Sequence, residues 1–130
     1  MGFLARVLTA RANQLFEELT GQSDITARQY GALLTLHQES QVTLTELAQH
    51  ISVDRSTLTE MIRRLLRAGL VARSDHGSDR RSVLVALTPA GEAAVVSLTP
   101  GAAQVQEALM ARLAPAERRQ MLRWMKMITG

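Results

Sequence analysis

Two short amphipathic segments, separated by only three residues, lie at the centre of this sequence and restrict the folds open to it. Thr43 and Glu46 have the spacing of a capping box, which begins a helix. The apolar stripe of that helix consists of Leu44, Leu47, Ala48 and Ile51. Asp54 follows the break and is the expected N-cap of a second helix, Arg55–Ala68, which Gly69 ends. The segment therefore predicts two short helices joined by a three-residue turn.

The hydrophobic period changes after Leu70, from roughly 3.6 residues, as in a helix, to roughly 2, as in a strand. Val71–Ser74 is a short extended piece, and the residues from 75 to 79 have the composition of a turn. Ser82–Leu87 is β-branched and apolar. Together these segments predict a β-hairpin with arginines at its tip.

Two helices are predicted before this centre. Phe3–Leu19 has apolar residues at steps of three and four, which is typical of an amphipathic helix. Thr26 and Gln29 form a second capping box and open a helix over Ala27–Gln38. Gly31 lies inside that helix, where it lowers helix propensity and could permit close packing.

Two more helices are predicted after the hairpin. One covers Pro89–Leu113, and Pro100 with Gly101 predicts a kink or break inside it. The last helix begins at Pro115 and ends at about Ile128. The order helix, helix, turn, helix, hairpin, helix is that of a winged helix-turn-helix protein. The predicted fold class is therefore mainly α with a small β-hairpin.

The outer face of the helix Arg55–Ala68 is the main candidate site. In projection its apolar residues cluster on one side, and they are Leu58, Met61, Ile62, Leu65 and Leu66. The opposite side and its flanks carry Ser56, Thr57, Thr59, Glu60, Arg63, Arg64 and Arg67. Arginine can bind guanine O6 and N7, glutamate can accept from cytosine N4, and hydroxyls can bind phosphates or base edges. Because the N-terminal turn faces DNA in this motif, Arg55, Ser56, Thr57 and Thr59 are expected to matter most.

The distribution of charge agrees with a nucleic-acid surface. The thirty residues Val53–Ser82 hold seven arginines and four acidic residues, so the whole net charge of +3 lies in this segment. A solvated, salt-bridged surface would have the same composition, and charge alone does not separate the two interpretations. The predicted hairpin favours DNA, because Arg80 and Arg81 would sit at its tip, where they suit a narrow minor groove. Arg73 lies in the hairpin too, and Asp79 is placed to hold one guanidinium.

The stretch from Thr26 to Gly91 resembles the MarR family of bacterial transcriptional regulators, and the likeness extends more weakly over the flanking helices. The segments that carry it are Thr43–Ala48, Val53–Leu58, Leu65–Arg73, Asp79–Arg81 and Leu87–Gly91. The resemblance implies that the helix after the turn reads the major groove, and that Arg81 enters the minor groove with Asp79 bracing it. It also implies terminal helices that interlock two subunits on a pseudo-palindromic operator in double-stranded DNA.

A homodimer is also expected from the apolar residues outside the winged-helix lobe. The residues assigned to the interface are Phe3, Leu4, Val7, Leu109, Leu113, Met121, Leu122 and Met125. They exceed what a lobe of about seventy residues can cover, so they need a partner surface. The alternative is an intramolecular helical layer. The predicted organisation is one domain over 1–130, with the lobe at 26–88 and dimerisation helices at 1–20 and 89–130.

Many proteins that resemble this one are repressors released by small aromatic acids or phenols. The candidate effector contacts are Phe16, Tyr30 and His37, with Arg11 as a partner for a carboxylate. For each of these side chains an ordinary place in the core or on the surface is favoured over an effector contact. The resemblance therefore predicts a small-molecule effector without fixing its site.

Several classes of function are discounted. The sequence has no cysteine, so disulfides, thiolate catalysis and cysteine-based metal sites are excluded, and a reducing cytoplasm is the expected location. His37, His50 and His76 fall on three different elements, so no metal site or other cofactor is predicted. No apolar run is long enough for a membrane span. No catalytic constellation is found, and the remaining alternative to a DNA-binding regulator is a winged-helix module that binds protein.

Overall fold

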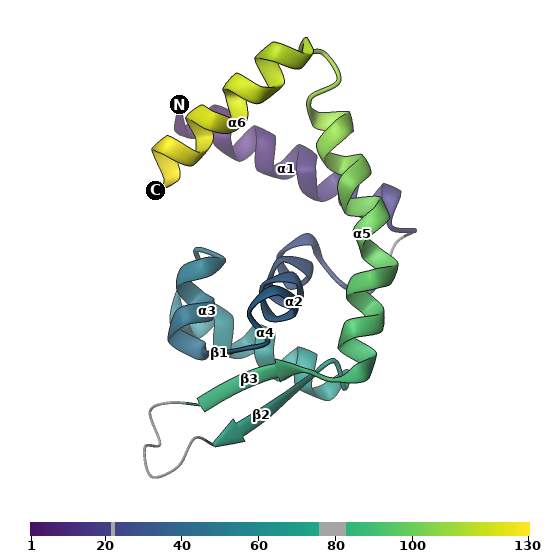
Figure 1. Ribbon diagram of the computed structural model, residues 1–130, viewed down its shortest axis with the longest axis vertical. Helices are drawn as coiled ribbons and strands as arrows, with labels where there is room; N and C mark the ends of the chain where they lie inside the picture. The colour runs from purple at the N-terminus through teal and green to yellow at the C-terminus, as the bar shows by residue number, and fades with distance from the viewer. Residues whose placement is uncertain (22, 76–82) are drawn as a thin grey trace. The chain divides into compact units, whose positions relative to one another are not determined.

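The computed structural model describes residues 1–21, 23–75 and 83–130, in which six helices and three strands follow one another along the chain. The helices are α1 (Gly2–Leu19), α2 (Ala27–Glu39), α3 (Leu44–His50), α4 (Arg55–Arg67), α5 (Pro89–Leu109) and α6 (Pro115–Thr129) (Figure 1). The strands are β1 (Gln41–Thr43), β2 (Val71–Asp75) and β3 (Val83–Leu87). The chain forms two compact units, a central unit, Ser23–Pro100, and a terminal unit made of Met1–Gln22 and Gly101–Gly130.

The sheet of the central unit has three strands in the order β1-β3-β2, with both pairs antiparallel. Strand β3 lies in the middle and pairs with β2 from Val71 opposite Leu87 onward. Strand β1 pairs with the other edge of β3, with Gln41 opposite Ala86. The sequence predicted only the two-stranded hairpin, because three residues are too few to show a period of two. The predicted fold class is confirmed, with one more strand than expected.

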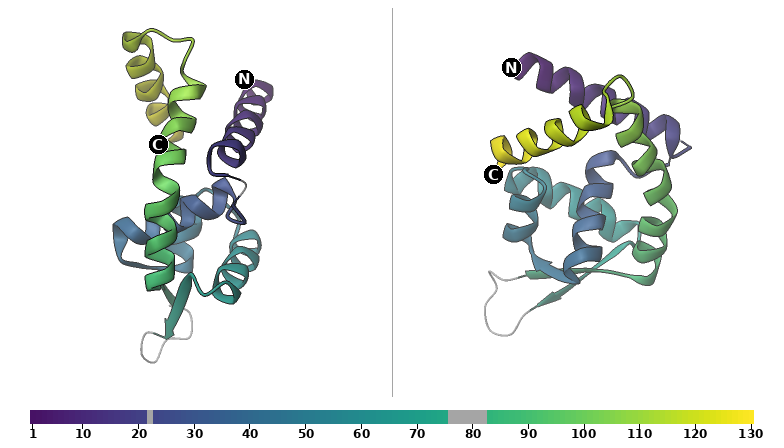
Figure 2. Two further views of the ribbon diagram at one scale, coloured as in Figure 1. Left: turned by 90° about the vertical axis from the view of Figure 1, so that its right-hand side faces the viewer. Right: turned by 45° about the horizontal axis from the view of Figure 1, so that its top comes forward.

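The core of the central unit lies between the sheet and helices α2, α3 and α4, which sit next to one another above the sheet in both views of Figure 2. Its largest fully buried side chains are Leu33, Leu36, Leu47, Leu58, Leu65 and Val85. Each buried side chain of this size contributes roughly 1.5–3 kcal/mol through the hydrophobic effect. The Cβ of an alanine at position 31 would meet nothing within 4 Å, so the expected close packing at Gly31 is wrong.

The helix ends are fixed by the predicted caps. At α2 the hydroxyl of Thr26 accepts from the Gln29 amide at 3.1 Å, and the Gln29 side chain accepts from the Thr26 amide at 3.0 Å. The same reciprocal pair joins Thr43 and Glu46 at α3. Helix α4 ends before Gly69, whose φ of 73° lies in the left-handed region that favours glycine.

The start of α5 is held tightly against the turn between α4 and β2. The Thr88 amide donates to the Leu70 carbonyl at 3.1 Å, and the Thr88 hydroxyl donates to the Gly69 carbonyl at 2.6 Å. The same hydroxyl accepts from the Gly91 amide at 3.1 Å. A Cβ on Gly91 would collide with the Leu70 carbonyl oxygen, so this approach requires glycine.

Helix α5 continues through Pro100 and ends at Leu109, followed by a turn that includes Leu113. Of the two predicted alternatives, the break at Pro100 is therefore wrong, and the kink stays a prediction. A proline removes a single backbone hydrogen bond, and the helix tolerates that loss here. In the terminal unit a Cβ on Gly101 would lie 2.9 Å from the Leu19 carbonyl oxygen, so α5 passes close to the end of α1.

The terminal unit buries few side chains. Leu15 and Phe16 of α1 and Val105 of α5 are buried, whereas α6 has no buried residue. Its large exposed apolar residues are Met1, Phe3, Leu4, Val7, Trp124, Met125, Met127 and Ile128. A single chain thus leaves a broad apolar surface on this unit in water. Among the described residues, no helix is both long and apolar enough to span a membrane.

Candidate nucleic-acid interface

Helix α4 separates its side chains into two faces, as the projection predicted. Leu58, Met61, Ile62 and Leu65 are buried and anchor the helix on the core. Arg55, Ser56, Thr59, Arg63, Arg64 and Arg67 are exposed, and Thr57 and Glu60 are half-buried. The core thus fixes the helix through one face, while the opposite face keeps its hydrogen-bonding groups available to a partner.

Asp54 organises the first turn of α4. Its Oδ1 accepts from the Thr57 amide at 2.8 Å and from the Ser56 hydroxyl at 2.6 Å, and its Oδ2 accepts from the Thr57 hydroxyl at 2.7 Å. These bonds, first of all the one from Ser56, hold the pKa of Asp54 well below its usual value. The carboxylate is therefore ionised at neutral pH. The sequence predicted the cap but not the two hydroxyl contacts.

The charged side chains of α4 are held by weak, exposed contacts. Arg55 donates to the Thr45 hydroxyl of α3 at 2.9 Å. Glu60 accepts from Arg63 at 2.6 Å and lies 3.7 Å from the Nε of Arg64. Exposed ion pairs of this kind contribute about 0–1 kcal/mol, so phosphates or bases can replace them at little cost. Thr45 was missed from the sequence, because no local pattern links residues ten apart across a turn.

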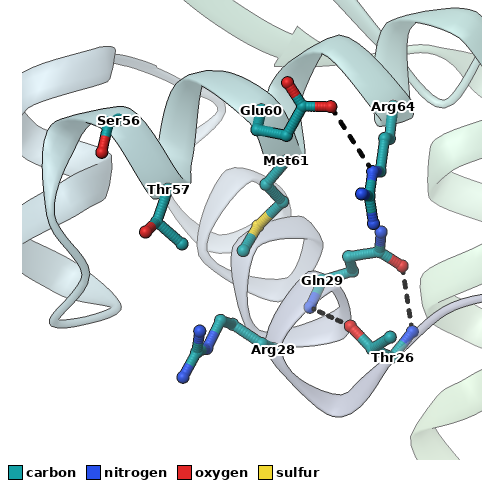
Figure 3. A pocket seen from close by; sticks show the side chains of 8 residues that line it. All are labelled: Thr26, Arg28, Gln29, Ser56, Thr57, Glu60, Met61 and Arg64. Carbon is teal, nitrogen blue, oxygen red and sulfur yellow. Dashed lines mark hydrogen bonds and ion pairs between the residues drawn. The ribbon is translucent and has the colours of Figure 1, made fainter.

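A hollow of about 450 Å³ lies beside α4, between it and the start of α2. Its lining is Thr26, Arg28, Gln29, Ser56, Thr57, Glu60, Met61 and Arg64 (Figure 3). In Figure 3, Arg28 and Arg64 lie on either side of Met61. Arg28 is exposed, and the charge pattern of the sequence does not point to it because it lies well before the arginine-rich segment. The fold thus adds a cation from α2 to the surface of α4.

The predicted wing is described only at its base. Arg73 lies in β2 opposite Val85, and its side chain is exposed. Asp79, Arg80 and Arg81 lie outside the described residues, and so does His76. Their assigned contacts with the minor groove therefore stay predictions.

The candidate effector residues belong to both units of the chain. Phe16 is buried in the terminal unit, whereas Tyr30 and His37 lie on α2 in the central unit. Tyr30 Oη lies 3.1 Å from the Thr99 hydroxyl, and His37 Nδ1 lies 2.6 Å from Glu92 Oε2. Both contacts tie α2 to α5. In the terminal unit the Arg11 guanidinium donates to Gln14 at 3.1 Å. Tyr30 and His37 thus have evident structural partners, and their assignment to an effector stays a prediction.

The assigned dimer residues lie on the terminal unit. Phe3, Leu4, Val7 and Met125 are exposed, and Leu109, Leu113, Met121 and Leu122 are half-buried. Met121 borders two apolar hollows, one of about 240 Å³ that Leu109 and Met125 also line, and one of about 610 Å³ beside Trp124. Over the described part of the chain, no group of three or more histidine, aspartate or glutamate side chains could hold a metal ion.

These elements define a winged helix-turn-helix protein, and comparison with known proteins identifies the family. The MarR family model matches residues 25–83. Multiple antibiotic resistance protein MarR of Escherichia coli is 36% identical over 93 residues, which cover 72% of this chain and 65% of that protein. The transcriptional repressor NicR of Pseudomonas putida is 30% identical over 118 residues, which cover 91% and 75%. The chain thus matches somewhat less than two thirds of the length of E. coli MarR.

Solved structures agree over nearly the whole chain. BpsR of Bordetella bronchiseptica, whose DNA binding is regulated by 6-hydroxynicotinic acid, has a TM-score of 0.91 and 31% identity, covering 99% of this chain and 92% of that one. A mutant of E. coli MarR complexed with operator DNA has a TM-score of 0.87 and 30% identity, covering 98% and 91%. This chain belongs to the MarR family of transcriptional regulators.

Proposed function

We propose that this protein is a homodimeric repressor that binds a pseudo-palindromic operator in double-stranded DNA and is released by a small aromatic effector. The observation that carries the proposal is the outer face of α4, where arginines and hydroxyls stand exposed on a helix whose other face is anchored in the core. E. coli MarR, which has the same fold, is known in complex with operator DNA.

In this function α4 lies in the major groove and the hairpin reaches the minor groove. The residues assigned to the major groove are Arg55, Ser56, Thr57, Thr59, Glu60 and Arg63. Those assigned to the wing are Arg73, Asp79, Arg80 and Arg81. Arg28 of α2 is added here as a contact to the phosphate backbone, because it is exposed and shares a hollow with α4.

The dimer is proposed to form through the terminal unit. Helix α6 has no buried residue in a single chain. A second copy that covered the exposed apolar side chains of α1 and α6 would remove them from water, which favours the dimer. Two-fold symmetry would then set two copies of α4 about 34 Å apart, one turn of DNA.

An aromatic acid is the proposed class of effector, because BpsR is regulated by 6-hydroxynicotinic acid. Phe16, Tyr30 and His37 remain the candidate contacts. We also infer a cytoplasmic location and no catalytic activity, since relatives such as NicR are transcriptional regulators.

Fluorescence anisotropy tests the proposal, with purified protein titrated into random and promoter duplexes at two salt concentrations. We expect a preference of about 10³ or more for a cognate duplex. The logarithm of the binding constant should fall by about 0.9 per neutralised phosphate for each unit of log salt concentration. No binding at low salt by a folded dimer would refute the proposal and favour a module that binds protein.

A further inference from the structure

The direction of the hydrogen bonds within α4 determines what its hydroxyl groups can offer to DNA. A free hydroxyl can donate or accept, but an ionised carboxylate can only accept. The Ser56 hydroxyl lies 2.6 Å from Asp54 Oδ1, and the Thr57 hydroxyl lies 2.7 Å from Asp54 Oδ2. Both hydroxyls therefore donate their protons to Asp54, and only their lone pairs remain for another partner.

The third hydroxyl on this part of the helix also donates its proton within the chain. Thr59 Oγ1 donates to the backbone carbonyl of Arg55 at 2.8 Å, and a carbonyl also only accepts. Ser56 and Thr59 are exposed and Thr57 is half-buried, and Ser56 and Thr57 also line the hollow beside α4. Glu60, the residue after Thr59, is a further acceptor. The first two turns of α4 thus present acceptors along one stretch, and most of the arginine donors follow nearer the end of the helix.

The major groove offers a limited set of complementary groups. Guanine presents acceptors at N7 and O6, and thymine presents O4, so neither offers a proton to an acceptor. The donors on the major-groove edges are the N6 amino group of adenine and the N4 amino group of cytosine. We propose that Ser56, Thr57 and Thr59 make the first two turns of α4 a reader of exocyclic amino groups, with Asp54 as the positioning residue that makes the Ser56 and Thr57 hydroxyls acceptors toward the DNA. The proposal rests on the proposed function, in which α4 enters the major groove.

A single substitution separates this role of Asp54 from its structural role. Asparagine is as good an N-cap as aspartate, so Asp54→Asn keeps the helix start. Its amide nitrogen, however, donates, so a hydroxyl beside it must accept and can turn its proton toward the DNA. Asp54→Asn should therefore shift the selected bases toward acceptors, guanine or thymine, without unfolding the chain.

The experiment begins with selection from a randomised duplex library by the wild-type full-length chain. The selected duplex is then made with N6-methyladenine or N4-methylcytosine at one position at a time, which replaces the hydrogen that the amino group offers in the major groove. At one or more positions we expect affinity to fall by roughly 2- to 12-fold, the range of one hydrogen bond. Ser56→Ala or Thr59→Val should bind the unmodified duplex more weakly than the wild-type chain. The affinity of that variant should also no longer fall when the base that the lost hydroxyl contacts is methylated.

The controls show whether a negative result counts against the role of the hydroxyls or against the proposed function as a whole. Glu117→Gln removes one negative charge at the start of α6 and should select the wild-type sequence, while circular dichroism checks the fold of every variant. If the wild-type chain selects no sequence, the proposed function fails and this inference falls with it. If it selects a sequence whose binding ignores methylation, or whose sensitivity persists in both hydroxyl variants, only this inference is overturned. An unchanged selection by Asp54→Asn would refute the positioning role of Asp54.

Discussion

Replacing Gly91 with alanine should destabilise the central unit, although the same change in another helix should stabilise it. The Cβ of Gly91→Ala would collide with the Leu70 carbonyl oxygen and lie 3.1 Å from a methyl group of Leu87. Backbone cannot rotate away as a flexible side chain can. The start of α5 must therefore move off the turn that precedes β2.

The magnitude follows from what this movement disrupts. It strains the packing by about 1–3 kcal/mol. It also weakens two hydrogen bonds, from the Thr88 amide to Leu70 at 3.1 Å and from the Thr88 hydroxyl to Gly69 at 2.6 Å. Each is worth about 0.5–1.5 kcal/mol. The higher helix propensity of alanine offsets up to about 1 kcal/mol of this cost, so the free energy of unfolding should fall by about 3 kcal/mol in all.

Gly31→Ala is the matched control, because a Cβ there meets nothing within 4 Å. Only the gain in helix propensity remains, so this variant should be more stable by about 0.5–1 kcal/mol. Urea unfolding of the full chain, followed by circular dichroism at one protein concentration, measures both values. A loss of about 3 kcal/mol lowers the urea midpoint by about 1–3 M at the usual dependence on denaturant. If Gly91→Ala were as stabilising as Gly31→Ala, the close approach of α5 to Leu70 would be refuted.

Three further outcomes are expected. Leu47→Ala should lower the free energy of unfolding by about 2–5 kcal/mol in the same titration, because this side chain is fully buried, and a loss under about 1 kcal/mol would contradict its place in the core. Because the pKa of Asp54 is lowered, its carboxylate stabilises the fold above the unfolded pKa near 4, and this contribution is lost as pH falls through the lowered pKa. Asp54→Asn should therefore reduce the dependence of stability on pH below about 5, and a variant whose stability falls with acid as steeply as that of the wild type would contradict this expectation. Met125→Glu should convert the proposed dimer into monomers in sedimentation experiments while Arg123→Glu does not, and a dimer that persists in Met125→Glu would place the interface elsewhere.

The sequence predicts the parts of this fold that depend on local interactions. The capping boxes at Thr26 and Thr43 involve residues three apart, so their reciprocal bonds could be recognised directly and are present. The buried face of α4 follows from a helical period and was predicted in the same way. Strand β1 was missed because its three residues are too few to show a period of two, and because its partner β3 lies far along the chain.

Long-range placement explains most of the remaining differences. Gly31 and Gly91 both lie within helices, and only the structure shows that backbone approaches the second and not the first. Pro100 predicted a kink or a break, and the structure keeps α5 continuous through it. At the candidate site the exposed arginines of α4 were predicted correctly. The approach of Arg28 and the bond from Arg55 to Thr45 depend on how separate helices meet, which no local pattern shows.

The pairing of β1 with β3 has a consequence for the order in which the central unit folds. Gln41 and Ala86 are partners although they are about 45 residues apart, and the loop that they close contains both α3 and α4. The hydrogen bonds between β1 and β3 therefore close a loop that contains the helix-turn-helix. Closing this loop costs chain entropy, so this strand pair is expected to form late. Because Leu58 of α4 and Val85 of β3 belong to one buried core, amide hydrogens of α4 and β3 should exchange with solvent as one cooperative unit.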